Sequence, residues 1–346
     1  MEYEYDESVF NKIQKAIINK FIESNIDKEL FKVLTSTKII PGPKPYVAPV
    51  FNTDMLRDIL TGVEYGLTAE QLNICVRLDI RKNPVYNFLQ MREIILGFRN
   101  SLSEDKVNIY ARCENDKPVY SCFNMNIIRN VIMSSNEKQI QQIKKMADNN
   151  LDFGKMLYIL DPNIPAENMR IMHSLCDSGC NKDFIRVTAL NNYSYESLKD
   201  LKYMVKCAKY FELDPNVLFE SKKLDIPSIR MFLSEKICEI DKFSKFYQIG
   251  EEAILNKIME CKMEPELIEF VISPDYQLNL QEMTAVAIGF LDGLTMEDMK
   301  DVFKKSYPGV EEIRKNIKEK INEKFFAIKD AEENISFMSS EEEIIL

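Results

Sequence analysis

Hydrophobic and polar residues recur with a fixed period between residues 48 and 111 of the chain. Ala48-Pro49-Val50-Phe51 returns as Asn83-Pro84-Val85-Tyr86, and the positions that follow return 35 residues later. The matched positions are Leu56-Arg57-Asp58-Ile59 with Met91-Arg92-Glu93-Ile94, and Gly62, Leu67, Thr68, Leu72 and Ile74 with Gly97, Leu102, Ser103, Val107 and Ile109. A period of this length indicates a structural repeat whose copies stack on one another.

Each repeat is predicted to be a helical hairpin. In the second repeat Pro84 ends the preceding element, and helices are expected from about residue 87 to 100 and from about 104 to 112. Ser103, like Thr68, precedes an acidic first turn, which is the pattern of a helix N-cap. One hairpin cannot bury its apolar stripe alone, so neighbouring hairpins are expected to stack.

The chain before the repeats predicts a helical cap. Apolar residues between Val9 and Phe21 have the spacing of one helical face, and a shorter helix is expected around residues 29–34. Three prolines between Pro41 and Pro45 exclude a helix interior, so residues 36–48 are predicted to be an extended connector. Residues 1–47 are therefore assigned to an N-terminal helical cap and connector.

The repeat is degenerate from residue 118 to residue 272 and then returns. Further helix starts are expected in this stretch, with the second helix of the third repeat shortened or lost, near Asn124, Ile140, Met169, Leu198 and Ile229. A short helical hairpin is expected around Pro265, and the strong pattern resumes from Pro274 to Pro308. An apolar i, i+4 stripe on a charged helix then predicts a C-terminal capping helix followed by an acidic tail in residues 309–346, at Ile313, Ile317, Ile321, Phe325 and Ile328.

Together these elements predict an all-α fold, a solenoid of about nine stacked helical hairpins in residues 48–308 with a helical cap at each end. The strong repeats share a Gln-Met-x-x-Ile start, a Gly-Phe or Gly-Leu middle and a Gly-Leu-Ser/Thr type of turn. In these features they resemble tandem helical-hairpin repeats of about 35 residues found in proteins of bacterial mobile elements and phages. The resemblance implies a helical solenoid and no assigned chemistry.

Composition restricts the compartment and the class of partner. Hydrophobic residues make up 45% of the chain and charged residues 29%, which indicates an ordered protein. No apolar run approaches the ~20 residues that span a membrane, and the first residues are acidic, so we expect a cytoplasmic protein without a membrane partner. The eight cysteines contain no Cys-x-x-Cys pair and are interpreted as reduced core residues. The net charge of −10 disfavours nucleic acid, unless a local basic stripe overrides it.

One cluster has the composition of a metal site. His173, Cys176 and Cys180 lie at i, i+3 and i+7 on one predicted helical face, and zinc accepts such ligands. The repeat pattern favours packing instead, because these positions hold apolar residues in the strong repeats. We therefore expect no metal site and no cofactor.

A basic position recurs after the Met of the first helix of each repeat. It holds Arg or Lys in five repeats, at Arg57, Arg92, Arg170, Lys199 and Arg230. Stacked helices would align these residues about 10 Å apart as a stripe that could bind phosphates or an acidic partner. The alternative, which we favour, is that each cation pairs with a nearby carboxylate such as Asp58 or Glu93.

Aromatic residues and lysines are interleaved near the sixth repeat. The residues are Tyr193, Tyr195, Tyr203, Tyr210 and Phe211 with Lys202, Lys206 and Lys209. Such a set could stack nucleic-acid bases, although packing between helices is the commoner reason for the pattern.

The sequence contains no motif that assigns a catalytic activity. There is no Gly-rich phosphate loop, no Ser elbow, no His-Glu-x-x-His motif and only one histidine. We expect a non-catalytic interaction protein whose extended surface binds a macromolecule, chiefly another protein, with no small-molecule substrate. The alternatives are a nucleic-acid-binding solenoid that uses the basic stripe, or an inhibitor of a host factor, which only the mobile-element resemblance suggests.

Overall fold

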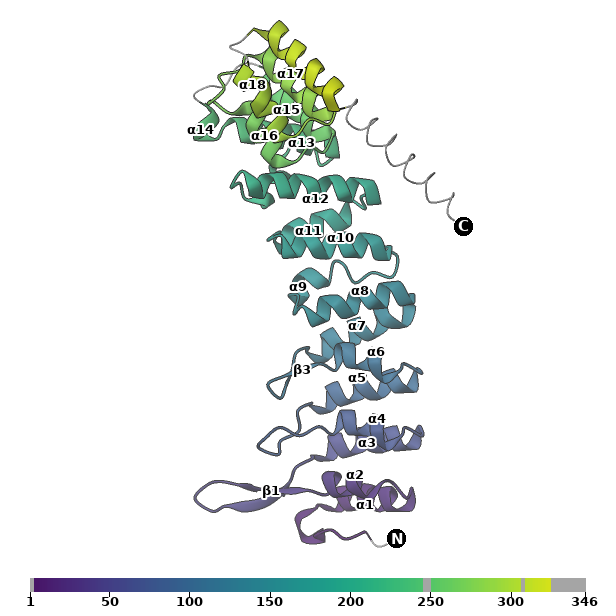
Figure 1. Cartoon of the computed structure of the whole chain (residues 1–346). Helices are drawn as coiled ribbons and strands as arrows, with labels where there is room; N and C mark the ends of the chain where they lie inside the picture. The colour runs from purple at the N-terminus through teal and green to yellow at the C-terminus, as the bar shows by residue number, and fades with distance from the viewer. Residues whose placement is uncertain (1–2, 245–249, 306–308, 325–346) are drawn as a thin grey trace, which may run out of the picture. The chain divides into compact units, whose positions relative to one another are not determined.

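The computed structural model describes residues 3–244, 250–305 and 309–324, and most of them are helical (Figure 1). Strands in these residues form only two short two-stranded sheets, so the all-α prediction is confirmed. None of the described helices combines the length and the apolar character needed to cross a membrane. The chain divides into an N-terminal body, Met1–His173, and a C-terminal body, Ser174–Leu346, and the division lies inside the stretch where the repeat is degenerate.

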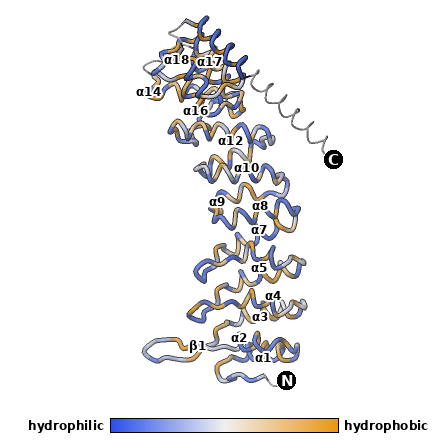
Figure 2. Tube along the Cα trace, in the orientation of Figure 1, coloured by the Kyte–Doolittle hydropathy of each residue, from blue (hydrophilic) through white to orange (hydrophobic). Residues whose placement is uncertain are grey.

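The N-terminal body is a series of helical hairpins. Its helices are η1 (Glu7–Val9), α1 (Lys12–Glu23), α2 (Lys28–Leu34), α3 (Thr53–Glu64), α4 (Ala69–Cys75), α5 (Phe88–Arg99), α6 (Glu104–Tyr110), α7 (Cys122–Ser134), α8 (Glu137–Asp148), α9 (Phe153–Met156) and the first part of α10 (Ala166–Asp177). The first helices of successive repeats contact one another in order, α1 with α3, α3 with α5 and α5 with α7. Hydrophobic and hydrophilic positions alternate along these helices, as amphipathic packing requires (Figure 2).

The predicted helices of the strong repeats are confirmed to within two residues at α5 and α6. The third repeat has lost its second helix, as predicted, because α7 ends at Ser134 and only Ser135 and Asn136 precede α8. The connector at residues 36–48 is extended, as predicted, but its two halves also pair. They form an antiparallel hairpin of β1 (Thr37–Ile40) and β2 (Tyr46–Pro49), a pairing that the sequence analysis did not predict.

A buried glutamine links each of several repeats to the next. Gln90 is the third residue of α5, and its Oε1 accepts a hydrogen bond from the N–H of the N-cap residue Asn87 at 3.0 Å. Its Nε2 donates to the carbonyl of Tyr120, the residue just before the N-cap of α7, at 2.8 Å. Gln14 makes the same pair of contacts to Asn11 and to the Phe51 carbonyl. One side chain thus caps its own helix and also fixes the start of the following one.

The turn inside each hairpin also recurs, with one backbone hydrogen bond that reaches back five residues. A residue with positive φ precedes the donor, and an apolar residue supplies the donor N–H, which is the Schellman geometry. The donors are Ile26, Leu67, Leu102 and Leu151 in the N-terminal body and Cys180, Leu213, Met263 and Leu294 in the C-terminal body. Their preceding residues are Asn25, Gly66, Ser101, Asn150, Gly179, Glu212, Lys262 and Gly293. The same hairpin turn is therefore present in both bodies, including the degenerate stretch.

Glycine in the first helix of the strong repeats allows the second helix to approach closely. A Cβ atom on Gly97 would lie 1.8 Å from the Tyr110 hydroxyl, and one on Gly289 would lie 2.3 Å from Met299 Cε. Both distances are shorter than a contact between non-bonded heavy atoms, so a side chain at either glycine would force its neighbour to move. The repeated Gly thus marks where the two helices of a hairpin cross.

The C-terminal body continues with helices of more varied length, from the four residues of α14 to the 16 of α12. They are α11 (Lys182–Leu190), α12 (Tyr195–Tyr210), η2 (Pro215–Glu220), α13 (Ile226–Cys238), α14 (Asp241–Ser244), α15 (Glu251–Glu260), α16 (Pro265–Ile272), α17 (Leu280–Leu291) and α18 (Met296–Lys305). Residues 310–324 form a further helix whose Ile313 and Ile317 are buried, as the predicted stripe requires. Phe325, Ile328 and the predicted acidic tail lie outside the described residues.

Replacing Gln90 by Met tests the link between repeats. The substitution keeps the volume, and α3 itself carries Met55 at this position, but both hydrogen bonds of the amide are lost. Because the Tyr120 carbonyl is buried with this donor, we expect the free energy of unfolding to fall by about 2 kcal/mol in urea denaturation followed by circular dichroism.

The matched control is Gln71→Met on α4. Gln71 caps its own helix by the same contact to Thr68, and no bond from it to another repeat is seen in the described residues. We expect a loss of about 0.5 kcal/mol. Equal losses in the two variants would show that Gln90 acts only as a cap.

Candidate functional site

Two of the five residues predicted to form a basic stripe lie on α3 and α5. Arg57 donates to Asp54 Oδ1 at 3.0 Å within its own helix, and both side chains are more than half exposed. Arg92 reaches back to the preceding repeat, where its Nε and Nη2 donate to Asp58 Oδ1 at 3.2 and 3.0 Å. Arg92 therefore joins α5 to α3.

The same relation recurs one repeat later, with a more deeply buried pair. Glu93 is the repeat equivalent of Asp58, and it accepts from Arg129 Nε at 2.9 Å and from Asn126 Nδ2 at 3.2 Å. The Arg129 and Glu93 side chains are only 8% and 13% exposed. The sequence analysis missed Arg129 because it lies outside the basic stripe position. The recurrence of a carboxylate at residues 58 and 93 was the signal that could have indicated a buried partner.

Burial affects the electrostatics of these carboxylate–arginine pairs. Burial raises the pKa of Asp58 above its ordinary value, although the hydrogen bonds and charge of Arg92 act in the opposite direction. A raised pKa means that the folded chain binds this proton more tightly than the unfolded chain does. Asp58 therefore favours the folded state at acidic pH and loses that contribution as the pH rises through its pKa. The Asp58–Arg92 pair holds two repeats in register at some cost in desolvation.

The other three stripe residues are exposed or half-buried. Arg170 is exposed on α10. In the C-terminal body Lys199 pairs with Glu196 at 3.0 Å, and Arg230 Nε donates to Asn256 Oδ1 at 3.0 Å. Three of the five stripe residues thus pair with a carboxylate, which is the arrangement that the alternative interpretation expected, while Arg230 pairs with the Asn256 amide.

The candidate zinc ligands are buried side chains. His173 and Cys176 are each 7% exposed and Cys180 is fully buried, in agreement with the packing interpretation. Asn149 Nδ2 lies 3.5 Å from His173 Nε2. Across the described residues no group of three or more His, Cys, Asp or Glu side chains is placed to hold a metal ion.

Three hairpin connections project from one side of the N-terminal body (Figure 1). They are the β1–β2 hairpin (residues 37–49), a loop closed by a Leu78–Pro84 bridge (residues 77–85), and a short hairpin of β3 (Cys113–Glu114) and β4 (Lys117–Pro118). Lys38 Nζ donates to Asn83 Oδ1 at 2.8 Å, and Arg77 lies 3.7 Å from Asp116. These contacts tie neighbouring connections together, and we name the three connections the hairpin edge.

The hairpin edge exposes apolar side chains. Ile80 is 92% exposed at the tip of the middle connection, and Ile39 is 72% exposed on β1. Val47, the strand partner of Ile39, and Tyr46 are also at least half exposed. Exposed apolar side chains gathered on neighbouring loops mark an interaction site more often than scattered ones do.

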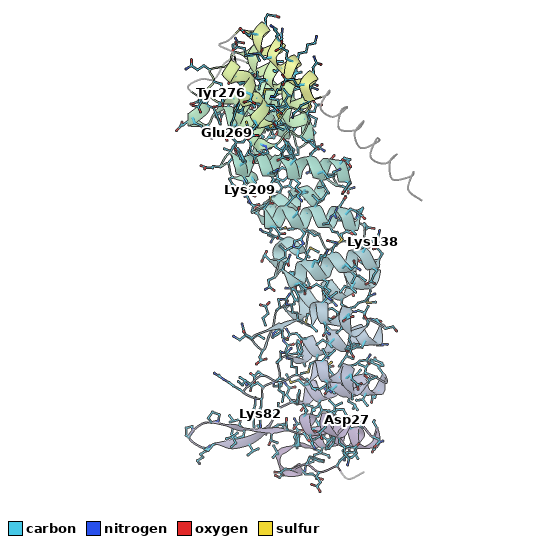
Figure 3. The ribbon with its side chains drawn as sticks, viewed as in Figure 1. Asp27, Lys82, Lys138, Lys209, Glu269 and Tyr276 are labelled. Carbon is cyan, nitrogen blue, oxygen red and sulfur yellow. The ribbon has the colours of Figure 1, made fainter. Side chains whose placement is uncertain are left out.

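The charge of the hairpin edge is opposite to that of the chain. It contains six basic and three acidic residues, whereas the whole chain has a net charge of −10. One of the three carboxylates, Asp79, is used inside its own turn, where it accepts from the N–H groups of Asn83 and Arg81. Figure 3 shows Lys82 on the middle connection. The sequence analysis recognised the prolines here as breaks between repeats and did not recognise the edge as a surface.

The C-terminal body has a basic groove of about 600 Å³. It is lined by Ser178, Lys199, Lys202, Tyr203, Lys206, Lys209, Lys262 and Glu264. Several of these residues belong to the aromatic and lysine cluster identified in the sequence. The structure places the lysines on the solvent side of α12 and turns the Tyr203 hydroxyl inward to the Met263 carbonyl.

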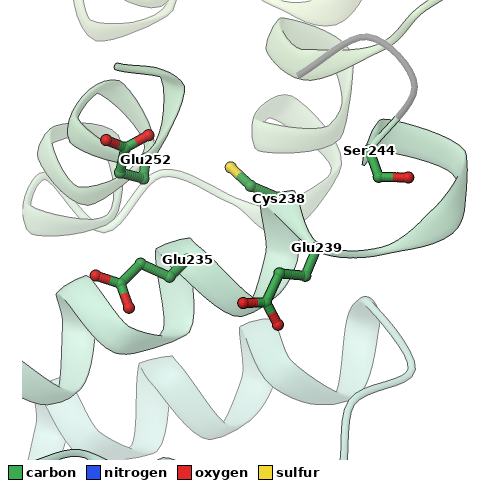
Figure 4. Close-up of a pocket in the computed structure, with 5 residues that line it drawn as sticks. All are labelled: Glu235, Cys238, Glu239, Ser244 and Glu252. Carbon is green, nitrogen blue, oxygen red and sulfur yellow. The ribbon is translucent and has the colours of Figure 1, made fainter. Parts of the chain in front are cut away.

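A second cavity in the same body, of about 470 Å³, is acidic (Figure 4). Glu235, Cys238 and Glu239 on α13, Ser244 on α14 and Glu252 on α15 line it. Burial, with the charges of nearby glutamates, raises the pKa of the Cys238 thiol to about 12. A thiol held protonated in this way is a poor nucleophile, so the cavity lacks the electropositive surroundings of a catalytic cysteine.

Loss of Arg129 is expected to destabilise the chain strongly. Arg129→Met leaves Glu93 buried with only the Asn126 amide, and breaking such a pair costs about 3–5 kcal/mol. The exposed pair offers a control, since Arg57→Met is expected to change the free energy of unfolding by less than about 1 kcal/mol. Urea titrations of both variants test the difference, and similar small losses would contradict a structural role for Arg129.

Alkylation should separate the cysteines by environment. At pH 8 about one Cys238 thiol in ten thousand is ionised, because its pKa is about 12. Cys261 is exposed and should react with iodoacetamide within minutes, while Cys238 and the fully buried Cys75 stay unmodified in peptide mass spectra of the native protein. Modification of Cys238 at the rate of Cys261 would contradict this picture.

Comparison with known proteins does not assign a site. The chain matches no protein-family model, no curated protein and no solved structure. The choice between the hairpin edge, the basic groove and the acidic cavity therefore depends on their own geometry and chemistry.

Proposed function

We propose that the protein is a non-catalytic interaction protein, a solenoid of stacked helical hairpins that binds a partner protein through the hairpin edge. The observation that supports this most is the exposure of Ile39, Tyr46, Val47 and Ile80 on connections that contact one another. Each of these exposed apolar side chains contacts water at a cost in free energy, which burial against a partner would remove.

The chemistry of the edge favours an acidic protein surface with apolar side chains. The basic residues flank the exposed apolar ones, as Lys38 flanks Ile39 and Arg81 flanks Ile80. Apolar side chains at the centre of an interface supply affinity, and charges at the rim supply orientation and speed of association. A partner with the opposite charge would be attracted to this edge although the chain as a whole is acidic.

The basic stripe supports a nucleic-acid partner less well. Arg92 is committed to Asp58, and Arg57 and Lys199 are paired on their own helices, so phosphates would have to displace carboxylates. Inhibition of a host factor is suggested by the mobile-element resemblance alone. The five stripe residues are therefore a weaker candidate surface than the hairpin edge.

Charge substitution at the edge tests the proposal. Ile39→Asp/Ile80→Asp is expected to keep the fold, because both side chains are more than two-thirds exposed and make few contacts to lose. A partner captured by the wild-type protein from its native host should be reduced about 10-fold or more, measured by quantitative mass spectrometry.

The control places the same charges elsewhere. Phe123→Asp/Leu190→Asp alters side chains that are 68% and 74% exposed on α7 and α11. We expect this variant to retain the partner. A partner that all three proteins retain, or that the control also loses, would contradict binding at the hairpin edge.

A further inference from the structure

The lysines of α12 form a single row on one side of the helix. Lys199, Lys202, Lys206 and Lys209 are exposed, and their spacing of three and four residues places them on one face. At 1.5 Å per residue the row is about 15 Å long. The acidic residues of this helix, Glu196 and Asp200, lie at the margin of this face or beyond it.

Two of these lysines are not neutralised. Lys199 pairs with Glu196 at 3.0 Å, and Lys206 pairs with Glu264. For Lys202 and Lys209 no acidic partner is found among the described residues, and both line the groove of about 600 Å³. Lys262, which also lines the groove, pairs with Asp200 of α12 at 2.6 Å. The groove thus presents unpaired positive charge at two points of the row.

Aromatic rings lie at both ends of the row. Tyr195 and Tyr210 are each 37% exposed, and they occupy the same face of α12 as the lysines. The Lys199 ammonium lies 5.2 Å from the centre of the Tyr195 ring, and the Tyr210 hydroxyl donates to Glu269 at 2.6 Å. The Tyr210 ring is therefore held in place while part of it remains accessible. Figure 3 shows Lys209 and Glu269 in this region.

We infer that the row Tyr195, Lys199, Lys202, Lys206, Lys209 and Tyr210 is a binding site for single-stranded nucleic acid. A strand carries one charge per nucleotide and a flat base beside it, and the helix offers separate point charges with rings at either end. A compact phosphate ligand would need the ammonium groups to converge, whereas these extend along about 15 Å of helix. Lysine gives contacts without base recognition, so little sequence preference is expected.

This site differs from the one proposed for the partner protein. The hairpin edge lies in the N-terminal body and is apolar with a basic rim, while the row belongs to one helix of the C-terminal body. We expect the loss of either binding activity to leave the other intact, so the two proposals can fail independently.

Binding of a fluorescent 12-nucleotide oligothymidylate to the full chain, followed by anisotropy at several salt concentrations, tests the site. Lys202→Glu/Lys209→Glu breaks no ion pair between described residues, so the fold should be kept. We expect its affinity to fall about 10-fold or more. The slope of log affinity against log salt should decrease in magnitude by about 1.4, because each phosphate contact of a single strand contributes about 0.7.

The control makes the same change of net charge on α8. Lys144 and Lys145 are exposed, and Lys144→Glu/Lys145→Glu should bind the oligonucleotide as the wild-type protein does. The inference is overturned if the wild-type protein does not bind, if the α12 variant binds normally, or if the control loses as much affinity.

Two further ligands distinguish nucleic acid from other anions. An abasic oligonucleotide with the same number of phosphates should bind about 10-fold more weakly, since it cannot stack on Tyr195 or Tyr210. A glutamate peptide of 12 residues should compete poorly. Equal affinity for either ligand would show that the row recognises charge alone and would overturn its assignment to nucleic acid.

Discussion

The buried glutamine at the start of the first helix of a repeat is the contact on which the arrangement of the N-terminal body depends. The first N–H groups of a helix lack partners within the helix, and a buried helix end must find them elsewhere. Gln14 and Gln90 meet this need for their own N-cap residues and use the remaining amide hydrogens on the carbonyl that precedes the next repeat. The same glutamine side chain therefore caps its own helix and sets the spacing to the next repeat. Two of the three connections are held in this way where they end, at the Phe51 and Tyr120 carbonyls, so the chain before each of these residues can leave the stack as a hairpin.

The ion pairs between helices of neighbouring repeats also hold the repeats together. Asp58 and Glu93 occupy equivalent positions, and each accepts hydrogen bonds from the following repeat, by Arg92 in one case and by Arg129 with Asn126 in the other. A buried carboxylate is costly unless it is paired, so these contacts favour one alignment of neighbouring repeats over a shifted one. Charged residues that recur in a repeat protein can thus stabilise the stacking of repeats. Binding surfaces for partners are then expected where the repeat pattern is interrupted.

The hairpin edge and the lysine row are both such places. The edge consists of the connections between repeats, which bury Val85 but expose Ile80 and Ile39. The row lies on α12, in the degenerate part of the chain, where η2 (Pro215–Glu220) replaces the second α-helix of the strong repeats. The two surfaces differ in chemistry, one apolar with a basic rim and one a line of point charges with aromatic ends. They suit different classes of macromolecule.

Local rules determined much of this protein from its sequence. The period of 35, the N-cap residues and the Gly-Leu turns predicted α5, α6 and the loss of the second helix after α7, because caps, turns and apolar stripes act within a few residues of one another. The burial of His173, Cys176 and Cys180 also followed from the repeat. The tertiary structure alone decided which polar groups meet across repeats. It paired Arg129 with Glu93, 36 positions earlier, linked Lys38 to Asn83, and paired Lys262 with Asp200 of α12. Periodicity fixes which face of a helix is apolar, but a long polar side chain can reach several neighbours, and only the packed arrangement of helices selects among them.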